Sequence, residues 1–129
     1  MSETFYNGAL KPYALPAAGR RLALQTLPSA IDALALASIA RKARDEGRMA
    51  FVICADPADL TRFADELSWI DPQLRCAVFP DWETLPYDAM SPHPDLVSER
   101  LESLYRLQPS DPDDMPDVLI ASAVTAAQR

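Results

Sequence analysis

The stretch 49-MAFVICADPADLTRFADELSWI-70 decides the fold class. Its first seven residues form a continuous apolar run, which is typical of a strand covered on both faces, as in the parallel sheets of α/β proteins. A helix follows at once, because Asp56 can cap it and Pro57 suits its first position. The apolar residues of this helix fall on one stripe at helical spacing, and they are Leu60, Phe63, Ala64, Leu67 and Ile70. The stretch therefore predicts one strand–helix unit of a parallel sheet.

The residues before this unit predict a second helix. The segment 28-PSAIDALALASIARKARDEG-47 carries apolar residues on nearly every side of its first three turns, so we expect burial on more than one face. Gly47 suits a left-handed C-cap. The preceding run 21-RLALQTL-27 could form a short strand. Residues 1–20 contain prolines and glycines without a sustained period, which indicates a leader or linker.

The residues after the unit continue the alternation of strands and helices. The apolar runs 74-LRCAVF-79 and 118-VLIASA-123 predict two more buried strands. Between them, a helix over about 94–107 is expected to bury an inner face made of Val97, Leu101, Leu104 and Tyr105. Such alternation implies right-handed crossovers and an α/β fold in which helices flank a parallel sheet. Because 124-VTAAQR-129 begins another helix and stops, we expect residues 21–129 to be one module that is truncated at its C-terminal end.

The composition is that of a folded, acidic domain. The 129 residues fit one domain, and 49% of them are hydrophobic, as in ordinary globular proteins. The net charge of -7 opposes binding to phosphate backbones. No apolar run approaches the roughly 20 residues of a membrane span, and the N-terminus lacks a signal-peptide layout, so we expect a cytoplasmic protein without membrane contact. Cys54 and Cys76 are expected to be buried free thiols.

A nucleotide site is the first function that an α/β sheet suggests, but the glycines argue against it. A Walker A loop reads G-x-x-x-x-G-K-[ST], because glycine lets backbone amides wrap the phosphates and lysine neutralises them. The chain contains only Gly8, Gly19 and Gly47, and none is followed by lysine. The junction 25-QTLPSAI-31, before the first expected helix, offers neither a cradle nor a cation. We therefore expect no ATP site and no cofactor.

The loop 79-FPDWETLPYDAMSPHPD-95 is the candidate functional segment. It leaves an expected strand at its carboxyl end, where open α/β sheets place functional loops, and its four prolines stiffen it. It could be a lid that buries its apolar residues in the domain's own core, or a rigid docking surface for another domain. His93, the single histidine, is expected to cap a helix or lie on the surface, and neither a catalytic nor a metal site is expected. The candidate residues are Asp81, Trp82, Glu83, Tyr87, Asp88 and His93.

The segment 81-DWETLPYDAMSPHPDLVSERLESLYRL-107 resembles the N-terminal region of the bacterial transcription-repair coupling factor (Mfd) family. The motif D-W-E-T-L-P-Y-D recurs in that family, followed by S-P-H-x-D and a helix that contains S-x-R-L. The weaker pattern of strands and helices around this segment extends the resemblance to about residues 20–129. UvrB is less similar, because it has a Gly-rich P-loop and a long tyrosine-rich hairpin that this chain lacks.

The resemblance implies both a fold and a role. The full protein of that family is an ATP-dependent DNA translocase that displaces stalled RNA polymerase and recruits nucleotide excision repair. Its UvrB-like N-terminal region opens with a RecA-like domain that has lost its ATP site, so we expect a partial RecA-like (P-loop NTPase-like) sheet. Contacts with UvrA, RNA polymerase and duplex DNA are implied for segments of the parent outside this chain.

Two functions from different classes remain open at this point. The first is a non-enzymatic scaffold module that contacts other domains of such a parent protein. The alternative is a free-standing α/β enzyme that uses residues 80–95 as an active-site lid over His93.

Overall fold

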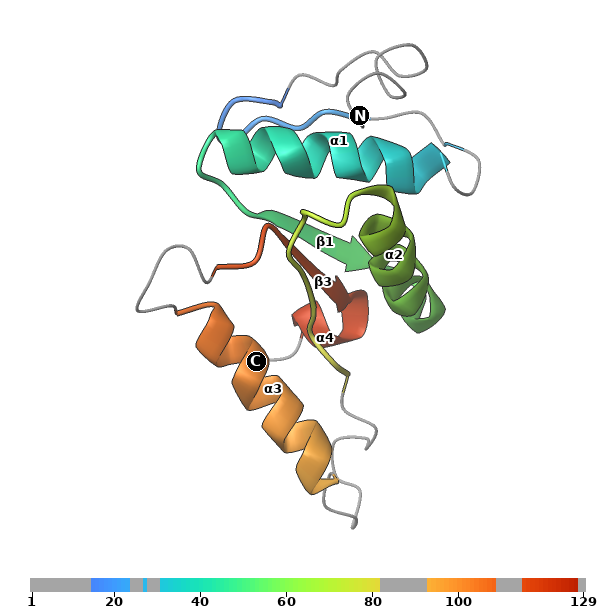
Figure 1. Cartoon of the computed structure of the whole chain (residues 1–129), viewed down its shortest axis with the longest axis vertical. Coiled ribbons are helices and arrows are strands. Elements are labelled where there is room, and N and C mark those ends of the chain that lie inside the picture. Colours follow the sequence, from blue (N-terminus) through green and yellow to red (C-terminus); the bar gives the residue numbers. More distant parts are fainter. Residues whose placement is uncertain (1–14, 24–26, 28–30, 82–92, 109–114, 128–129) are drawn as a thin grey trace.

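The fold is a three-stranded parallel sheet flanked by helices (Figure 1). The strands are β1 (Ala50–Cys54), β2 (Cys76–Val78) and β3 (Val118–Ser122), and β3 lies in the centre in the order β1-β3-β2. This arrangement confirms the predicted α/β class and the parallel sheet. The computed structural model describes residues 15–23, 27, 31–81, 93–108 and 115–127.

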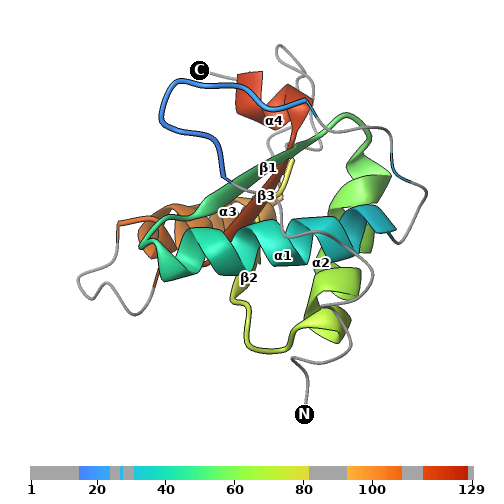
Figure 2. The same cartoon turned by 90° about the horizontal axis from the view of Figure 1, so that it is seen from above.

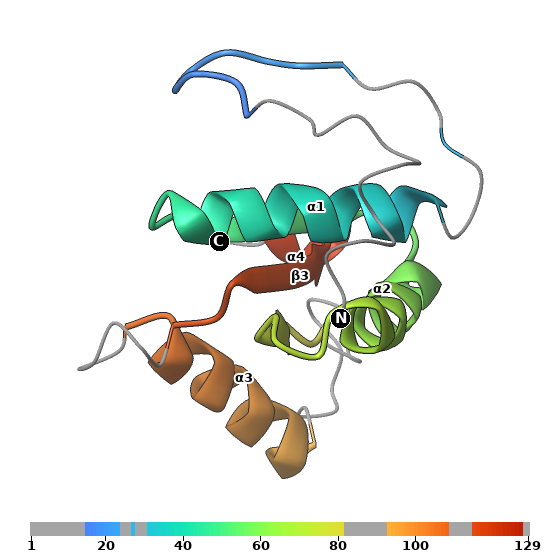
Figure 3. The ribbon, with the colours of Figure 1, turned by 45° about the horizontal axis from the view of Figure 1, so that its top comes forward.

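Four helices accompany the strands within these residues: α1 (Ile31–Asp45), α2 (Pro57–Ile70), α3 (Pro94–Arg106) and α4 (Ala123–Ala127). The strands run past α1 toward α4, which follows the carboxyl end of β3 (Figure 2). Helix α3 lies on the opposite side of β3 from α1 (Figure 3). None of these helices is long and apolar enough to cross a membrane.

Local signals explain why α1 and α2 begin and end where they do. The side chain of Asp56 accepts a hydrogen bond from the Ala58 N–H at 2.9 Å, and Pro57 occupies the first turn, as predicted for α2. Gly47 adopts a φ of +66°, and the next N–H, from Arg48, donates to the Ala43 carbonyl at 2.8 Å. This is the left-handed C-cap expected after α1.

The core lies between α1, α2 and one face of the sheet. Leu67 of α2 is fully buried against Val118 and Ile120 of β3. Small residues of α1, among them Ala37 and Ala40, are buried in the same cluster and let this helix approach the sheet closely. The strand register brings the alternate residues of β1 onto this face, since Ala50 pairs with Val118 and Val52 pairs with Ile120.

The second face of β1 is open to solvent. Phe51 and Ile53 are 51% and 56% exposed, whereas every residue of β3 is buried. The prediction of a buried strand is therefore confirmed for β3, wrong for β1 and right only in part for β2, where Ala77 is buried but Val78 is 37% exposed. The physical reason is that α1 and α2 pack against the face of β1 that carries Ala50, Val52 and Cys54, and not against the face that carries Phe51 and Ile53.

Helix α3 has the predicted extent but not the predicted orientation. Leu101, Leu104 and Tyr105 were expected on its inner face, yet their exposed fractions are 61%, 49% and 71%. Val97 is half-buried. The inner-face prediction is therefore wrong for three of these four residues.

The polar side of α3 faces the sheet because β2 is an edge strand that offers free carbonyls there. Ser103 Oγ donates to the Val78 carbonyl at 3.4 Å, and Arg100 Nη1 donates to the Pro80 carbonyl at 2.5 Å. The Arg100 guanidinium also lies over the Phe79 ring, 4.5 Å from its centroid. Hydrogen bonds to the strand end thus determine which side of α3 turns inward.

The possible strand at 21–27 is not formed in the residues that can be described there. Arg21 to Ala23 have no strand conformation, and Leu22 is 53% exposed. An alternating run forms a strand only where a sheet edge pairs with it, and β1 and β2 pair only with β3 in the described sheet. Residues 24–26 lie outside the described part of the chain, as does most of the predicted leader, 1–14.

Candidate functional site

The candidate site lies at the edge where the three parallel strands end. Open α/β sheets bind ligands in the crevice outside the carboxyl ends of the strands. A cavity of about 400 Å³ lies at the end of β1, under the first turns of α1 and α2. Its wall is mostly apolar and includes Leu36, Cys54 and Phe63, whereas Asp32 and Asp59 supply its charges.

A network around Arg62 of α2 sets the electrostatics of this cavity. Arg62 Nη2 lies 3.0 Å from Asp32 Oδ2 of α1, and its Nε lies 3.0 Å from Asp59 Oδ1. Its Nη1 lies 3.1 Å from Glu66 Oε2. The hydrogen bond with Asp32 is the largest cause of the raised pKa of Arg62. One guanidinium is thus shared among three carboxylates, which leaves the network negatively charged.

Asp32 lies at the N-terminal end of α1, where the dipole of a helix attracts anions. It lies in the first turn of α1, and its Oδ1 accepts a hydrogen bond from the Ala33 N–H at 2.7 Å. A carboxylate there satisfies the positive end of the helix dipole in place of a bound anion. An incoming polyphosphate would meet Asp32 and Asp59, and the cation nearby, Arg62, is already paired with both. The cavity therefore favours neutral or cationic groups over anions.

The thiols do not provide a nucleophile here. Cys54 is buried in the cavity wall, and burial, followed by the charge of Asp59, raises its pKa. Cys76 is half-buried, and burial raises its pKa too. Both cysteines are free, so the prediction of buried thiols is confirmed for Cys54 and holds in part for Cys76. Because the thiolate is the reactive form, the raised pKa values favour the less reactive thiol form of both groups.

Asp81 is the first candidate loop residue that the structure places. Its Oδ1 accepts hydrogen bonds from Ser122 Oγ at 2.5 Å and from Thr125 Oγ1. Ser122 Oγ in turn accepts from the Thr125 N–H at 3.0 Å at the start of α4. Asp81 thus connects the segment that follows β2 to the end of β3 through hydrogen bonds, so its role in the described residues is structural.

His93 caps a helix. Its Nδ1 accepts from the Asp95 N–H at 3.4 Å at the N-terminus of α3, and 68% of its side chain is exposed. Asp81 and His93 therefore make separate sets of contacts. The other candidates, Trp82, Glu83, Tyr87 and Asp88, lie outside the described residues, so the choice between lid and docking surface stays a prediction. Among the described residues, no group of three or more histidine, cysteine or acidic side chains could hold a metal ion.

The sequence analysis missed the Arg62 network. Its local part has a readable signal, because Asp59 and Glu66 stand three residues before and four residues after Arg62 on one helix. Asp32 stands 30 positions away from Arg62, and only the packing of α1 on α2 brings the two together.

The comparisons with known proteins agree with the resemblance in the 81–107 segment. No protein-family model matches the chain, and no solved structure matches it. The chain is 42% identical over 82 residues to the transcription-repair-coupling factor of Haemophilus influenzae, covering 64% of this chain and 7% of that protein. It is 39% identical over 118 residues to the transcription-repair-coupling factor of Escherichia coli, covering 91% of this chain and 10% of that protein.

The chain thus spans a tenth or less of the length of these relatives. The similarity nevertheless includes most of the described fold, since the longer match covers 91% of the chain. The chain is therefore a homologue of one segment of the transcription-repair-coupling factors, and the match is consistent with their N-terminal module.

Proposed function

We propose that this chain is a scaffold module, without an ATP site of its own, of a transcription-repair coupling factor. In this proposal the parent is an ATP-dependent DNA translocase of the cytoplasm that displaces stalled RNA polymerase and recruits nucleotide excision repair. Contacts with UvrA, RNA polymerase and duplex DNA belong to other segments of the parent. The module itself is not an enzyme and packs against other domains.

The uncovered face of β1 is the observation that carries the proposal. Phe51 and Ile53 are more than half exposed although they flank Val52, which packs against the core. Adjacent large apolar side chains on an edge strand invite pairing or aggregation unless another element covers them. A scaffold that joins other domains of its parent needs such a face, whereas a free-standing enzyme does not.

The charges at the carboxyl edge of the sheet support the absence of an ATP site. Asp32 stands at the helix N-terminus where phosphates would bind, and Arg62 is committed to carboxylates. The three glycines of the chain, Gly8, Gly19 and Gly47, do not form a Walker A pattern. The enzyme alternative loses support from His93, since its ring nitrogen is engaged in a helix cap on the surface.

Hydrogen exchange tests the scaffold proposal. The amides of β1 are compared in this chain alone and in the full-length parent protein, with peptides from the core of α2 around Leu67 as the internal control. We expect the β1 peptides to exchange at least about tenfold more slowly in the parent, because covering an edge strand suppresses its local opening. The α2 peptides should exchange at similar rates in both. Equal exchange of β1 in the two proteins would contradict the proposal.

A further inference from the structure

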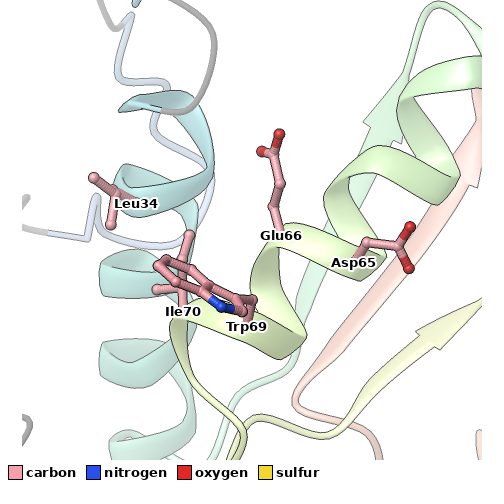
Figure 4. Close-up of a pocket in the computed structure, with 5 residues that line it drawn as sticks. All are labelled: Leu34, Asp65, Glu66, Trp69 and Ile70. Atoms are coloured by element: carbon pink, nitrogen blue, oxygen red, sulfur yellow. The ribbon is translucent and has the colours of Figure 1, made fainter.

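We propose that a groove beside Trp69 binds a basic, apolar segment of a partner protein. The groove has a volume of about 460 Å³ and lies between α1 and the C-terminal half of α2. Figure 4 shows the Trp69 indole beside Ile70 on the side that faces α1, with Leu34 across from them. These three side chains form an apolar floor.

Trp69 is too exposed for a residue that serves only its own fold. It is 83% exposed, the largest fraction among the exposed large hydrophobic residues of the described chain. It also lies off the stripe of α2 that packs into the core, which includes Leu60 and Leu67. Tryptophan is enriched among the residues that dominate binding energy at interfaces, because it buries a large rigid area at little cost in side-chain entropy.

The charges around the groove indicate which sign of charge the bound segment of the partner carries. Figure 4 shows Glu66 and Asp65 on α2, both on the side of Trp69 away from Leu34, with their carboxylates pointing in different directions. Glu66 is paired with Arg62, which also pairs with Asp32 and Asp59, and Arg41 of α1 pairs with Asp71, the residue after Ile70. With Asp65, five carboxylates therefore stand against two guanidinium groups on this part of α1 and α2. The chain as a whole carries a net charge of -7. A cationic occupant is therefore favoured.

The same charges decide which class of macromolecule fits. Phosphate backbones and anionic lipid surfaces would be repelled by this rim, so nucleic acid and membrane are disfavoured. An arginine or lysine side chain combines an apolar stem, which can pack along Leu34 and Ile70, with a cationic head. That head can lie over the Trp69 ring and reach the carboxylate of Asp65. A protein segment with a basic residue between apolar ones matches both the floor and the rim.

The probe for this test is a pair of degenerate decapeptide pools with apolar flanking residues. One pool carries arginine at the central position, and the other carries glutamate. Each pool is titrated to millimolar concentration into the isotope-labelled chain, and the indole N–H of Trp69 and the methyl groups of Leu34 and Ile70 are followed by NMR. We expect the arginine pool to shift the NMR signals of all three residues and the glutamate pool to leave these signals unchanged.

Two variants and a matched control make the result specific. Trp69→Ala should weaken binding of the arginine pool at least about tenfold, because it removes the aromatic anchor. Asp65→Asn should weaken it about threefold, because it removes one partly solvated charge. Tyr105→Ala removes another exposed aromatic, on α3, and should leave the affinity unchanged. Because Trp69 is a surface residue, its variant should keep the melting temperature of the wild type.

Three results would overturn the inference. The first is no shift with the arginine pool, and the second is an equal shift with both pools. The third is a shift of Trp69 with protein concentration alone, which would identify a second copy of the chain as the occupant. The inference does not depend on the proposed function, because the groove lies on the helical side of the sheet and Phe51 and Ile53 lie on the open face of β1.

Discussion

Removing the carboxylate of Asp81 should measurably loosen the carboxyl edge of the sheet. Its Oδ1 accepts hydrogen bonds from Ser122 and Thr125, which are themselves buried. A hydrogen bond to a charged acceptor contributes about 1.5–3 kcal/mol. Because Asp81 is half-buried, we take the low end for each bond and expect Asp81→Ala to cost about 2–4 kcal/mol. Asp81→Asn keeps an acceptor oxygen and should cost about half as much.

Urea denaturation followed by circular dichroism measures these costs. Asp45→Ala is the matched control, because Asp45 is an exposed acid at the end of α1 and its loss should stay within about 0.5 kcal/mol. A double-mutant cycle with Thr125→Val isolates the contact, and we expect a coupling of about 1 kcal/mol. If Asp81→Ala is no worse than the control, or if the cycle gives no coupling, the assignment of Asp81 as a structural tie is wrong.

Other predictions concern pH, nucleotide and DNA. Burial alone would raise the pKa of Asp117, but hydrogen bonds from Arg75 outweigh it and lower the pKa. The stabilisation is therefore present above the ordinary aspartate pKa of about 3.9 and is lost as pH falls through the lower folded value. Asp117→Asn should cost about 1.5–3 kcal/mol at pH 7, and urea midpoints should show the gap to the wild type closing below about pH 4. Titration with a fluorescent ATP analogue and magnesium should show no saturable binding, and a Kd below about 100 μM, or roughly -5.5 kcal/mol, would count against the absence of a site. Gel shifts at low salt should show no binding of duplex DNA, and a shift at micromolar protein that weakens steeply with salt would reveal a basic patch.

Elements whose signals are local were predictable from the sequence. Helix α2 follows from Asp56, Pro57 and its apolar stripe, all of which act within the helix or next to it. The end of α1 follows from Gly47, because a left-handed residue is needed there and glycine adopts it without a steric cost. Strand β3 follows from an unbroken apolar run, which is typical of a strand covered on both faces.

Features that depend on which elements meet were not predictable. The pairing of Asp32 with Arg62 requires α1 to pack on α2, and no local sequence pattern predicts that these two residues meet. The side of α3 that faces the sheet depends on the carbonyl of Val78, at the end of the edge strand β2, and on that of Pro80, just beyond this strand, which accept hydrogen bonds from Ser103 and Arg100. Hydrophobic periodicity predicted a different side of α3, since it counts apolar residues and ignores carbonyls that need donors.

The two errors in predicted burial have one physical explanation. Phe51 and Ile53 of β1, and Leu101, Leu104 and Tyr105 of α3, all belong to apolar patterns that natural domains bury, yet all are exposed. The core lies between α1, α2 and the sheet, and these side chains point away from it. Helix α3 lies on the side of β3 opposite α1 (Figure 3). Groups of exposed large apolar residues mark interaction sites more often than single scattered ones do. Under the proposed scaffold function, other domains of the parent would cover the open face of β1 and the outer stripe of α3. A scaffold module of a longer coupling factor would provide that setting.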